Sequence, residues 1–254
     1  MTLKALTISD KVIPFIYSSS VRKRFADVDL VISCGDLPYY YLEYIISMLN
    51  KPLFFVRGNH ASVVEHGSHG ERTEPWGAID LHRTVLNHNG LLMAGFEGSM
   101  RYNKGNFQYT DSQMYSYIAR LLPRLFLNRA LYGRYLDVLV THAPPRGIHD
   151  QPDRCHTGFA AFRWFLKHIR PRYMLHGHIH VYNSNTITHT TFHNTEVINC
   201  YGYREIELLV PDGSRASALK GAGYDRSHGT HRLRASHTES ILESDYKLAD
   251  GSQQ

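Results

Sequence analysis

The chain has 254 residues, of which 43% are hydrophobic and 20% are charged. This composition is ordinary for a globular protein, and the length allows one large α/β domain or two small ones. The formal net charge of +5 suits an anionic substrate but is too small to indicate a nucleic-acid-binding protein. Three scattered cysteines and no apolar run of membrane-spanning length argue against a disulfide framework and a membrane partner. We therefore expect a cytoplasmic protein.

Residues 3–9 are expected to form the first strand, which ends at Asp10. Residues 31–60 then predict a strand, a turn, a helix, a second strand and a second turn, because the apolar positions 42, 45, 46 and 49 follow one helical face. The two turns are Gly35-Asp36 and Gly58-Asn59-His60. Strands joined by a helix pair in parallel, so both turns should lie at the carboxyl edge of one sheet, where α/β sheets bind ligands.

The segment Ala61–Val85 is polar and rich in Gly, His and Glu, which predicts a long surface loop. Residues 91–95 predict another strand. A helical stripe of apolar residues follows at positions 114–122. Asp111 is placed to cap that helix, and Pro123 should kink or end it.

Residues 136–140 predict a strand that ends at Thr141-His142, and residues 173–175 lead into Gly177-His178-Ile179-His180 after an amphipathic helix. From residue 186 to 210, β-branched and polar residues alternate, which predicts antiparallel strands covering a second sheet. Residues 211–254 hold too few apolar residues for a core. We therefore expect a domain over 1–210 and a disordered tail over 211–254.

Five predicted strand ends carry side chains that bind metals. These residues are Asp10, Asp36, Asn59 followed by His60, His142, and His178 with His180. Taken singly, an acidic turn or one histidine is more often a structural feature. The combination is hard to obtain from turn chemistry alone. It offers carboxylate oxygens and imidazole nitrogens on rigid strands, as a pair of divalent metal ions requires.

In these motifs the chain resembles the calcineurin-like metallophosphoesterases, whose pattern runs D-x-H, GD, GNH, a strand-end H and GHxH. The resemblance covers residues 1 to about 210 and implies an α/β fold, a four-layer α/β/β/α sandwich of two mixed sheets. By analogy, one metal ion is held by Asp10, Asp36 and His180. The other takes Asp36, Asn59, His142 and His178, so that Asp36 bridges the two ions.

The family resemblance implies a metal-dependent phosphoesterase that hydrolyses a phosphomonoester or phosphodiester through a metal-bound hydroxide. Two divalent ions about 3.5–4 Å apart polarise water and clamp the phosphate oxygens. Mn, Fe or Zn would serve, and manganese is favoured. His60 is the candidate general acid for the leaving alkoxide, and its alternative role is to orient a carboxylate.

The first motif departs from the family pattern, because Val12 stands where the family has a histidine ligand. A water molecule could fill that position, or a side chain from the 61–85 loop such as His66, His69 or Glu71. Alternatively, the first site is weakly occupied. Ala61 is a milder departure, since many relatives carry an acidic residue after the GNH motif.

The missing histidine supports a second hypothesis, a metallophosphoesterase-like scaffold that has lost catalysis and binds a protein partner. The other ligand positions are intact, which favours the enzyme. Nuclease action would require a continuous basic groove, which the sequence does not show, so we do not expect a nucleic acid partner.

Two further groups of residues leave alternatives open. His149, Asp150, Asp153 and His156 lie between the last two motifs and belong either to the substrate entrance or to a polar surface loop. The tyrosines at 39–41 either wall the pocket or pack at the start of a helix.

Overall fold

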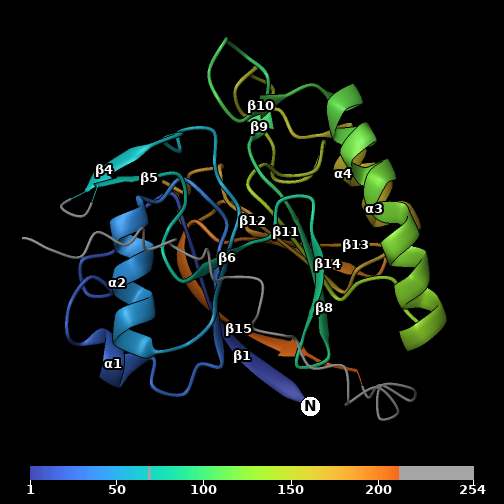
Figure 1. Cartoon of the computed structure of the whole chain (residues 1–254). Coiled ribbons are helices and arrows are strands. Elements are labelled where there is room, and N and C mark those ends of the chain that lie inside the picture. The colour runs from blue at the N-terminus through green and yellow to red at the C-terminus, as the bar shows by residue number, and fades with distance from the viewer. Residues whose placement is uncertain (68–69, 212–254) are drawn as a thin grey trace, which may run out of the picture. The chain divides into compact units, whose positions relative to one another are not determined.

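A computed structural model describes residues 1–67 and 70–211, so the expected tail from residue 212 onward and His69 lie outside the described residues. The first sheet has the strand order β15-β1-β2-β3-β6 (Figure 1). These strands are β15 (Gly202–Leu209), β1 (Thr2–Ser9), β2 (Leu30–Ser33), β3 (Leu53–Phe55) and β6 (Ala78–Asp80). Strand β15 is antiparallel to β1, and the other neighbours are parallel. The sheet is therefore mixed, with its parallel strands ending at one edge.

The second sheet has the order β13-β14-β12-β11-β8-β7. Its strands are β13 (His189–Phe192), β14 (Thr195–Asn199), β12 (Tyr173–His176), β11 (Val138–Thr141), β8 (Leu91–Phe96) and β7 (Val85–His88). The four central strands are parallel, and the two outer strands are antiparallel to their neighbours. The prediction for 186–210 is therefore wrong in part, because β14 is parallel to β12 and β15 returns to the first sheet.

Two short pairs of strands complete the fold. Strands β4 (Glu65–Gly67) and β5 (Gly70–Arg72) form an antiparallel hairpin, and β9 (Ser99–Met100) pairs in parallel with β10 (Gln108–Tyr109). The prediction of one surface loop over 61–85 is wrong, since this segment holds the hairpin and strand β6. Strand β6 has only three half-buried residues, so its sequence shows no strand periodicity.

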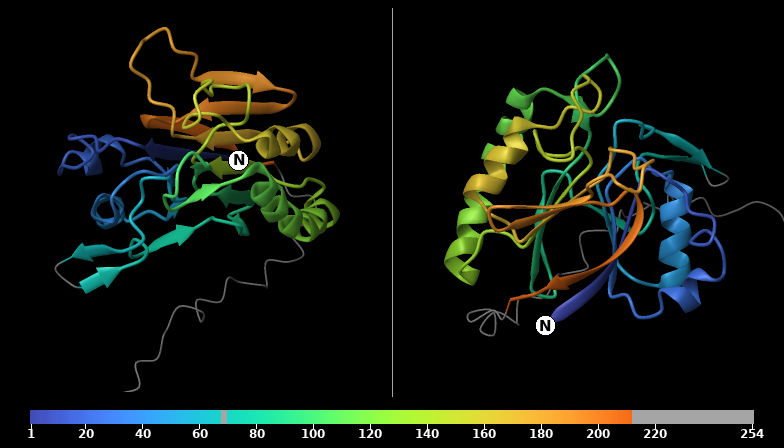
Figure 2. Two further views of the ribbon diagram at one scale, coloured as in Figure 1. Left: turned by 90° about the horizontal axis from the view of Figure 1, so that it is seen from above. Right: turned by 180° about the vertical axis from the view of Figure 1, so that it is seen from behind.

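Helices cover the outer face of each sheet. On the first sheet these are α1 (Val21–Arg24) and α2 (Tyr39–Leu49), and on the second they are α3 (Asp111–Tyr132) and α4 (Ala160–His168) (Figure 2). A third apolar core lies between the sheets, where Ile32 and Phe54 meet Met93 and Val140. The helix and sheet layers thus follow the order α/β/β/α. Among the described residues, no helix combines the length and the apolar character needed to cross a membrane.

Helix α3 begins one residue earlier than the sequence suggests and does not end at its proline. Thr110 is the N-cap, and it forms a capping box with Gln113, so the prediction of Asp111 as the cap is wrong. The helix continues through Pro123 to Tyr132. Buried side chains on both sides of the proline, Leu121 and Leu125, pack against the second sheet, and this packing offsets the lost backbone hydrogen bond.

We expect Thr110→Ala to lower the free energy of unfolding by about 1 kcal/mol, because the first turn of α3 loses its side-chain acceptor. Urea denaturation would measure the change. Ser116→Ala is the matched control, since Ser116 lies exposed inside the same helix and caps nothing in the described contacts. Equal stability of the Thr110 variant and wild type would show that the capping box contributes nothing.

Candidate metal centre

The candidate residues follow the carboxyl ends of parallel strands in both sheets. Asp10 follows β1, Asp36 follows β2, Asn59 and His60 follow β3, His142 follows β11, and His178 and His180 follow β12. Hydrogen bonds join the turns. The backbone N–H of Asp10 donates to the Gly35 carbonyl at 3.1 Å, and that of His178 donates to the Asp10 carboxylate at 3.1 Å. The second bond ties the two sheets together at this edge.

Ligand atoms converge around His142, which is fully buried. Its Nε2 atom lies 3.1 Å from Asp36 Oδ2 and 3.0 Å from Asn59 Oδ1. One ligand atom each from Asp36, His142 and His178 lies within 4.8 Å of the others. A carboxylate oxygen, an amide oxygen and two imidazole nitrogens therefore meet at one point. That donor set fits a divalent metal ion.

The two histidine rings are held by backbone carbonyls on their far sides. His142 Nδ1 lies 2.8 Å from the Cys34 carbonyl oxygen, and His178 Nε2 lies 2.8 Å from that of Cys155. A carbonyl can only accept, so each of these nitrogens carries the proton. The other nitrogen of each neutral ring is then free to bind a metal ion, as in known metal sites.

The pKa values at the site reflect burial and the pairing of Asp36 with His142. Burial alone would raise the pKa of Asp36, but His142 and the His60 backbone N–H lower it to about 2. Burial alone would lower the pKa of His142, but Asp36 and Asp10 raise it to about 9. Burial lowers the pKa of His178 to about 3. Asp36 and His142 thus stabilise each other's charged forms, whereas burial favours the neutral form of His178.

Three of the candidate ligands have left-handed backbone conformations. Asp10 has φ 63°, Asp36 has φ 53° and His178 has φ 67°. Such conformations cost about 1–3 kcal/mol each outside glycine and concentrate at functional sites. The neighbouring Gly35 has φ 101°, and a Cβ atom there would lie 2.7 Å from His142 Nδ1. The backbone at this edge is therefore shaped by the close approach of the ligand side chains.

The first metal position has fewer donors. The Asp10 side chain is buried, and burial raises its pKa. His180 Nε2 lies 3.8 Å from Asp10 Oδ1, while His180 Nδ1 lies 2.7 Å from the Tyr182 hydroxyl. Val12 is half-buried and packs against the apolar core beneath the first sheet. The valine therefore has a packing role in place of coordination.

Two of the side chains suggested as replacements for the missing histidine lie on the β4–β5 hairpin, and His69 lies outside the described residues. His66 and Glu71 face each other across the β4–β5 hairpin at 3.6 Å, and both side chains are more than two-thirds exposed. Glu65 of that hairpin accepts the Tyr39 backbone N–H at the start of α2. The hairpin thus contacts α2.

The residues between the last two motifs divide into two groups. His156 Nδ1 lies 2.9 Å from the Asp153 carboxylate, and the His156 ring lies 5.3 Å from that of His178, beside the candidate site. His149 instead lies within hydrogen-bonding distance of the buried His176, at 2.9 Å. Asp150 accepts the backbone N–H groups of the turn, from Gly147 and Gly158. Asp153 and His156 therefore border the candidate site, whereas His149 and Asp150 form contacts with other groups.

His60 and the tyrosines have distinct placements. The His60 backbone N–H donates to Asp36 Oδ1 at 2.8 Å, and His60 is exposed to solvent. Tyr39 and Tyr41 are buried in the packing of α2, whereas Tyr40 is exposed on that helix. Helix packing therefore explains two of the three tyrosines.

Two contacts at the centre have no signal in the sequence. Tyr102 reaches Asn59 from the loop between β9 and β10, and its hydroxyl lies 3.2 Å from Asn59 Nδ2. Cys155 acts through its main-chain carbonyl, a group that every residue carries. Neither position shows a motif or a periodicity, so only the folded chain reveals them.

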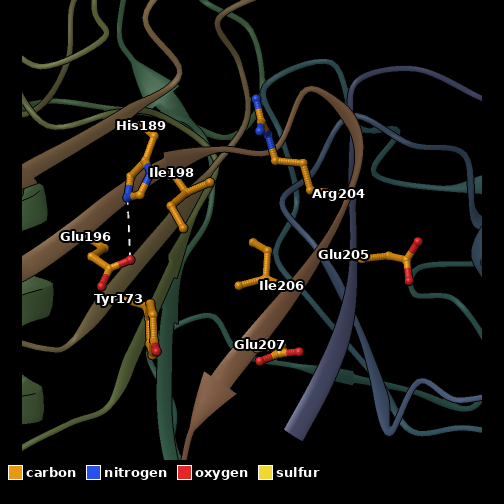
Figure 3. Close-up of a pocket in the computed structure, with 8 residues that line it drawn as sticks. All are labelled: Tyr173, His189, Glu196, Ile198, Arg204, Glu205, Ile206 and Glu207. Atoms are coloured by element: carbon orange, nitrogen blue, oxygen red, sulfur yellow. Dashed lines mark ion pairs between the residues drawn. The ribbon is translucent and has the colours of Figure 1, made fainter. Parts of the chain in front are cut away.

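A separate cavity of about 510 Å³ lies where β14 and β15 diverge (Figure 3). Its lining includes Tyr173, Glu196 and Glu207, and His189 pairs with Glu196 at 3.4 Å. Tyr173 begins β12, whereas the His178 turn follows the end of that strand. The cavity is therefore distinct from the candidate metal centre, and none of the candidate ligands lines it.

Comparisons with known proteins identify a family and a fold for the chain. The family model for calcineurin-like phosphoesterases matches residues 10–182. One solved crystal structure is similar to this chain with a TM-score of 0.58 and 17% sequence identity. The match covers 82% of this chain and 96% of the chain in that crystal structure. The protein TT1561 of Thermus thermophilus has a TM-score of 0.53 and 12% identity, covering 82% of this chain and all of its own. At these identities the two structures show a shared fold. No protein of curated function matches the sequence significantly.

Proposed function

Because the chain belongs to the calcineurin-like phosphoesterase family, we propose that it hydrolyses a phosphomonoester or phosphodiester with the help of divalent metal ions. The observation that carries the proposal is the convergence of Asp36 Oδ2 and Asn59 Oδ1 on His142 Nε2, within 3.1 Å. A structural role alone would not require a buried carboxylate, an amide and two histidines to face one point.

Asp36, Asn59, His142 and His178 would hold one ion, and Asp10 and His180 would hold the other together with Asp36. When bound, the ions supply Lewis acidity that activates water and neutralises charge on the phosphate. Asp36 suits the shared position because it has two oxygens, and the His60 backbone N–H orients one of them. Backbone carbonyls hold the rings of His142 and His178 in a fixed orientation.

His60 is proposed as the proton donor to the leaving oxygen. The hydrogen bond from its backbone N–H to Asp36 fixes the main chain of His60, and His60 is exposed to solvent. An exposed imidazole beside the reacting phosphate can donate a proton and recover one from solvent. The exposed position of His60 directly after Asn59 supports this role.

The choice of metal ion and the charge of the substrate follow from the donor atoms and the composition of the chain. Manganese is favoured, because the first position offers mainly carboxylate oxygens, which suit hard ions better than zinc. The phosphate-ester substrate is anionic, in keeping with the net charge of +5. We propose a cytoplasmic location and no nucleic acid or membrane partner.

Metal removal tests the proposed function. The full chain, stripped with a chelator and dialysed, is assayed against a panel of phosphomonoesters and phosphodiesters before and after manganese addition. We expect no turnover without metal and recovery with manganese. Turnover of the stripped protein at the original rate would contradict metal dependence. Metal binding without turnover of any ester would favour the alternative, a scaffold that binds a protein partner.

We expect Val12→His to tighten manganese binding at the weaker of two sites by about tenfold, or about 1.4 kcal/mol. Family members supply a histidine ligand at this position, and the new ring must reach the ion without displacing the core packing around the first strand. Calorimetric titration of wild type and variant would measure the change. Leu127→His is the control, since Leu127 is exposed on α3, a helix that carries none of the candidate ligands. Two equally tight sites in wild type, unchanged by the substitution, would show that another group already completes the first site.

A further inference from the structure

The side-chain amide of Asn59 can meet a metal ion in only one of its two orientations. Its oxygen accepts, whereas its NH₂ group only donates and would repel a cation. Asn59 is 6% exposed, so solvent contributes little to fixing the orientation. In the structure Oδ1 faces His142 Nε2 at 3.0 Å, and Nδ2 points the other way, to the Tyr102 hydroxyl at 3.2 Å. Tyr102 is therefore the partner of the donor end.

The loop that carries Tyr102 is held by its own side chains. The Gln108 carboxamide oxygen accepts the backbone N–H groups of Tyr102 and Asn103 at 3.2 and 3.1 Å, and its nitrogen donates to Asn103 Oδ1 at 2.7 Å. Gly98 opens the loop with φ 75°, and a Cβ atom there would collide with the Phe107 carbonyl. Tyr102 is half-buried, although Asn103 beside it is exposed. The loop thus projects one ordered tyrosine toward Asn59.

A second loop meets the first at this tyrosine. Cys155 is a neighbour of Tyr102, and the Cys155 carbonyl accepts the His178 Nε2 proton at 2.8 Å. Two neutral ligands of the same ion, Asn59 and His178, are therefore oriented by two loops that touch each other. The third, His142, is oriented by Cys34 at the end of β2.

We propose that Tyr102 is a positioning residue of the second metal site: its hydroxyl accepts from Asn59 and so keeps the amide oxygen directed at the ion. The inference rests on the ligand role of Asn59 in the proposed function. Partners of this kind affect metal affinity or activity by about 10–100-fold. Tyr102→Phe removes the acceptor and keeps the ring, so it isolates the contribution of the hydroxyl.

Calorimetric manganese titration of the full, metal-stripped chain tests the proposal. We expect Tyr102→Phe to raise the Kd of one of two sites by about 10–100-fold and to leave the other unchanged. Tyr115→Phe is the matched control, since Tyr115 is a partly exposed tyrosine on α3 whose ring packs on Trp164. We expect the control to bind manganese as wild type does. Wild-type affinity in Tyr102→Phe would overturn the proposal.

The same Tyr102→Phe substitution in an Asn59→Asp variant separates an effect on the orientation of the residue 59 side chain from general structural damage. In Asn59→Asp both side-chain oxygens can accept the ion, so no partner is needed to select one of them. We expect Tyr102→Phe to add little further loss of affinity in that background. An equal loss in both backgrounds would overturn the positioning role. The titration does not depend on turnover. If the titrations give the expected affinities but the protein hydrolyses no ester, the role of Tyr102 is supported and the proposed reaction is contradicted.

Discussion

Asp36→Asn should abolish nearly all phosphoester hydrolysis, with a loss of about 10³-fold or more. A loss of that size corresponds to about 4 kcal/mol of transition-state stabilisation, within what a metal centre supplies. Asparagine keeps the volume of the side chain, but it has one acceptor oxygen and no charge, so it cannot serve two cations. It also tolerates the left-handed backbone at this position, φ 53°, and the chain should remain folded.

Steady-state kinetics with added manganese would measure the loss, and circular dichroism would confirm the fold. Asp27→Asn makes the same chemical change at an exposed carboxylate that pairs with Lys4, where little effect is expected. Full activity in Asp36→Asn would rule out a shared carboxylate at the metal centre.

His60→Ala should slow esters of poor leaving groups by about 10²–10⁴-fold while affecting activated aryl esters much less. An alkoxide needs a proton as its bond to phosphorus breaks, whereas a nitrophenolate leaves without one. Alanine keeps the backbone N–H that donates to Asp36, so the substitution removes the ring and leaves that contact in place.

The comparison requires paired kcat values for an alkyl and an aryl phosphate in wild type and variant. His168→Ala, which removes an exposed histidine of α4, is the control and should change neither value. Equal losses on both esters in His60→Ala would assign His60 a positioning role and leave the proton donor to another group.

The local pattern of the sequence predicts the centre of the fold well. The strand, helix and strand expected over 31–60 correspond to β2, α2 and β3, because short apolar runs and a helical stripe are each long enough to show a period. The polar residues at the ends of these strands meet at one edge, as parallel pairing requires. Asp36 and Asn59 therefore lie together although they are far apart in the sequence.

Features that depend on distant packing could not be predicted. Strand β6 is three residues long, and Pro123 remains inside α3 only because the second sheet packs against the helix around it. The destination of β15 is set by pairing with β1, across almost the whole described chain. Tyr102 depends on a loop closed by Gln108, a contact with no periodic signal. Long-range contacts decide each of these cases.

The left-handed backbone at Asp10, Asp36 and His178 also bears on how such a centre can change over evolutionary time. Glycine occupies this conformation more easily than aspartate or histidine. Replacement by glycine would remove a candidate ligand and release part of the strain, so we expect such a substitution to weaken the proposed site while lowering the backbone strain. Under the proposed function, selection for hydrolysis acts against a drift toward more stable and less active descendants. We expect a relative with glycine at one of these positions to be a weaker metal binder on a less strained backbone.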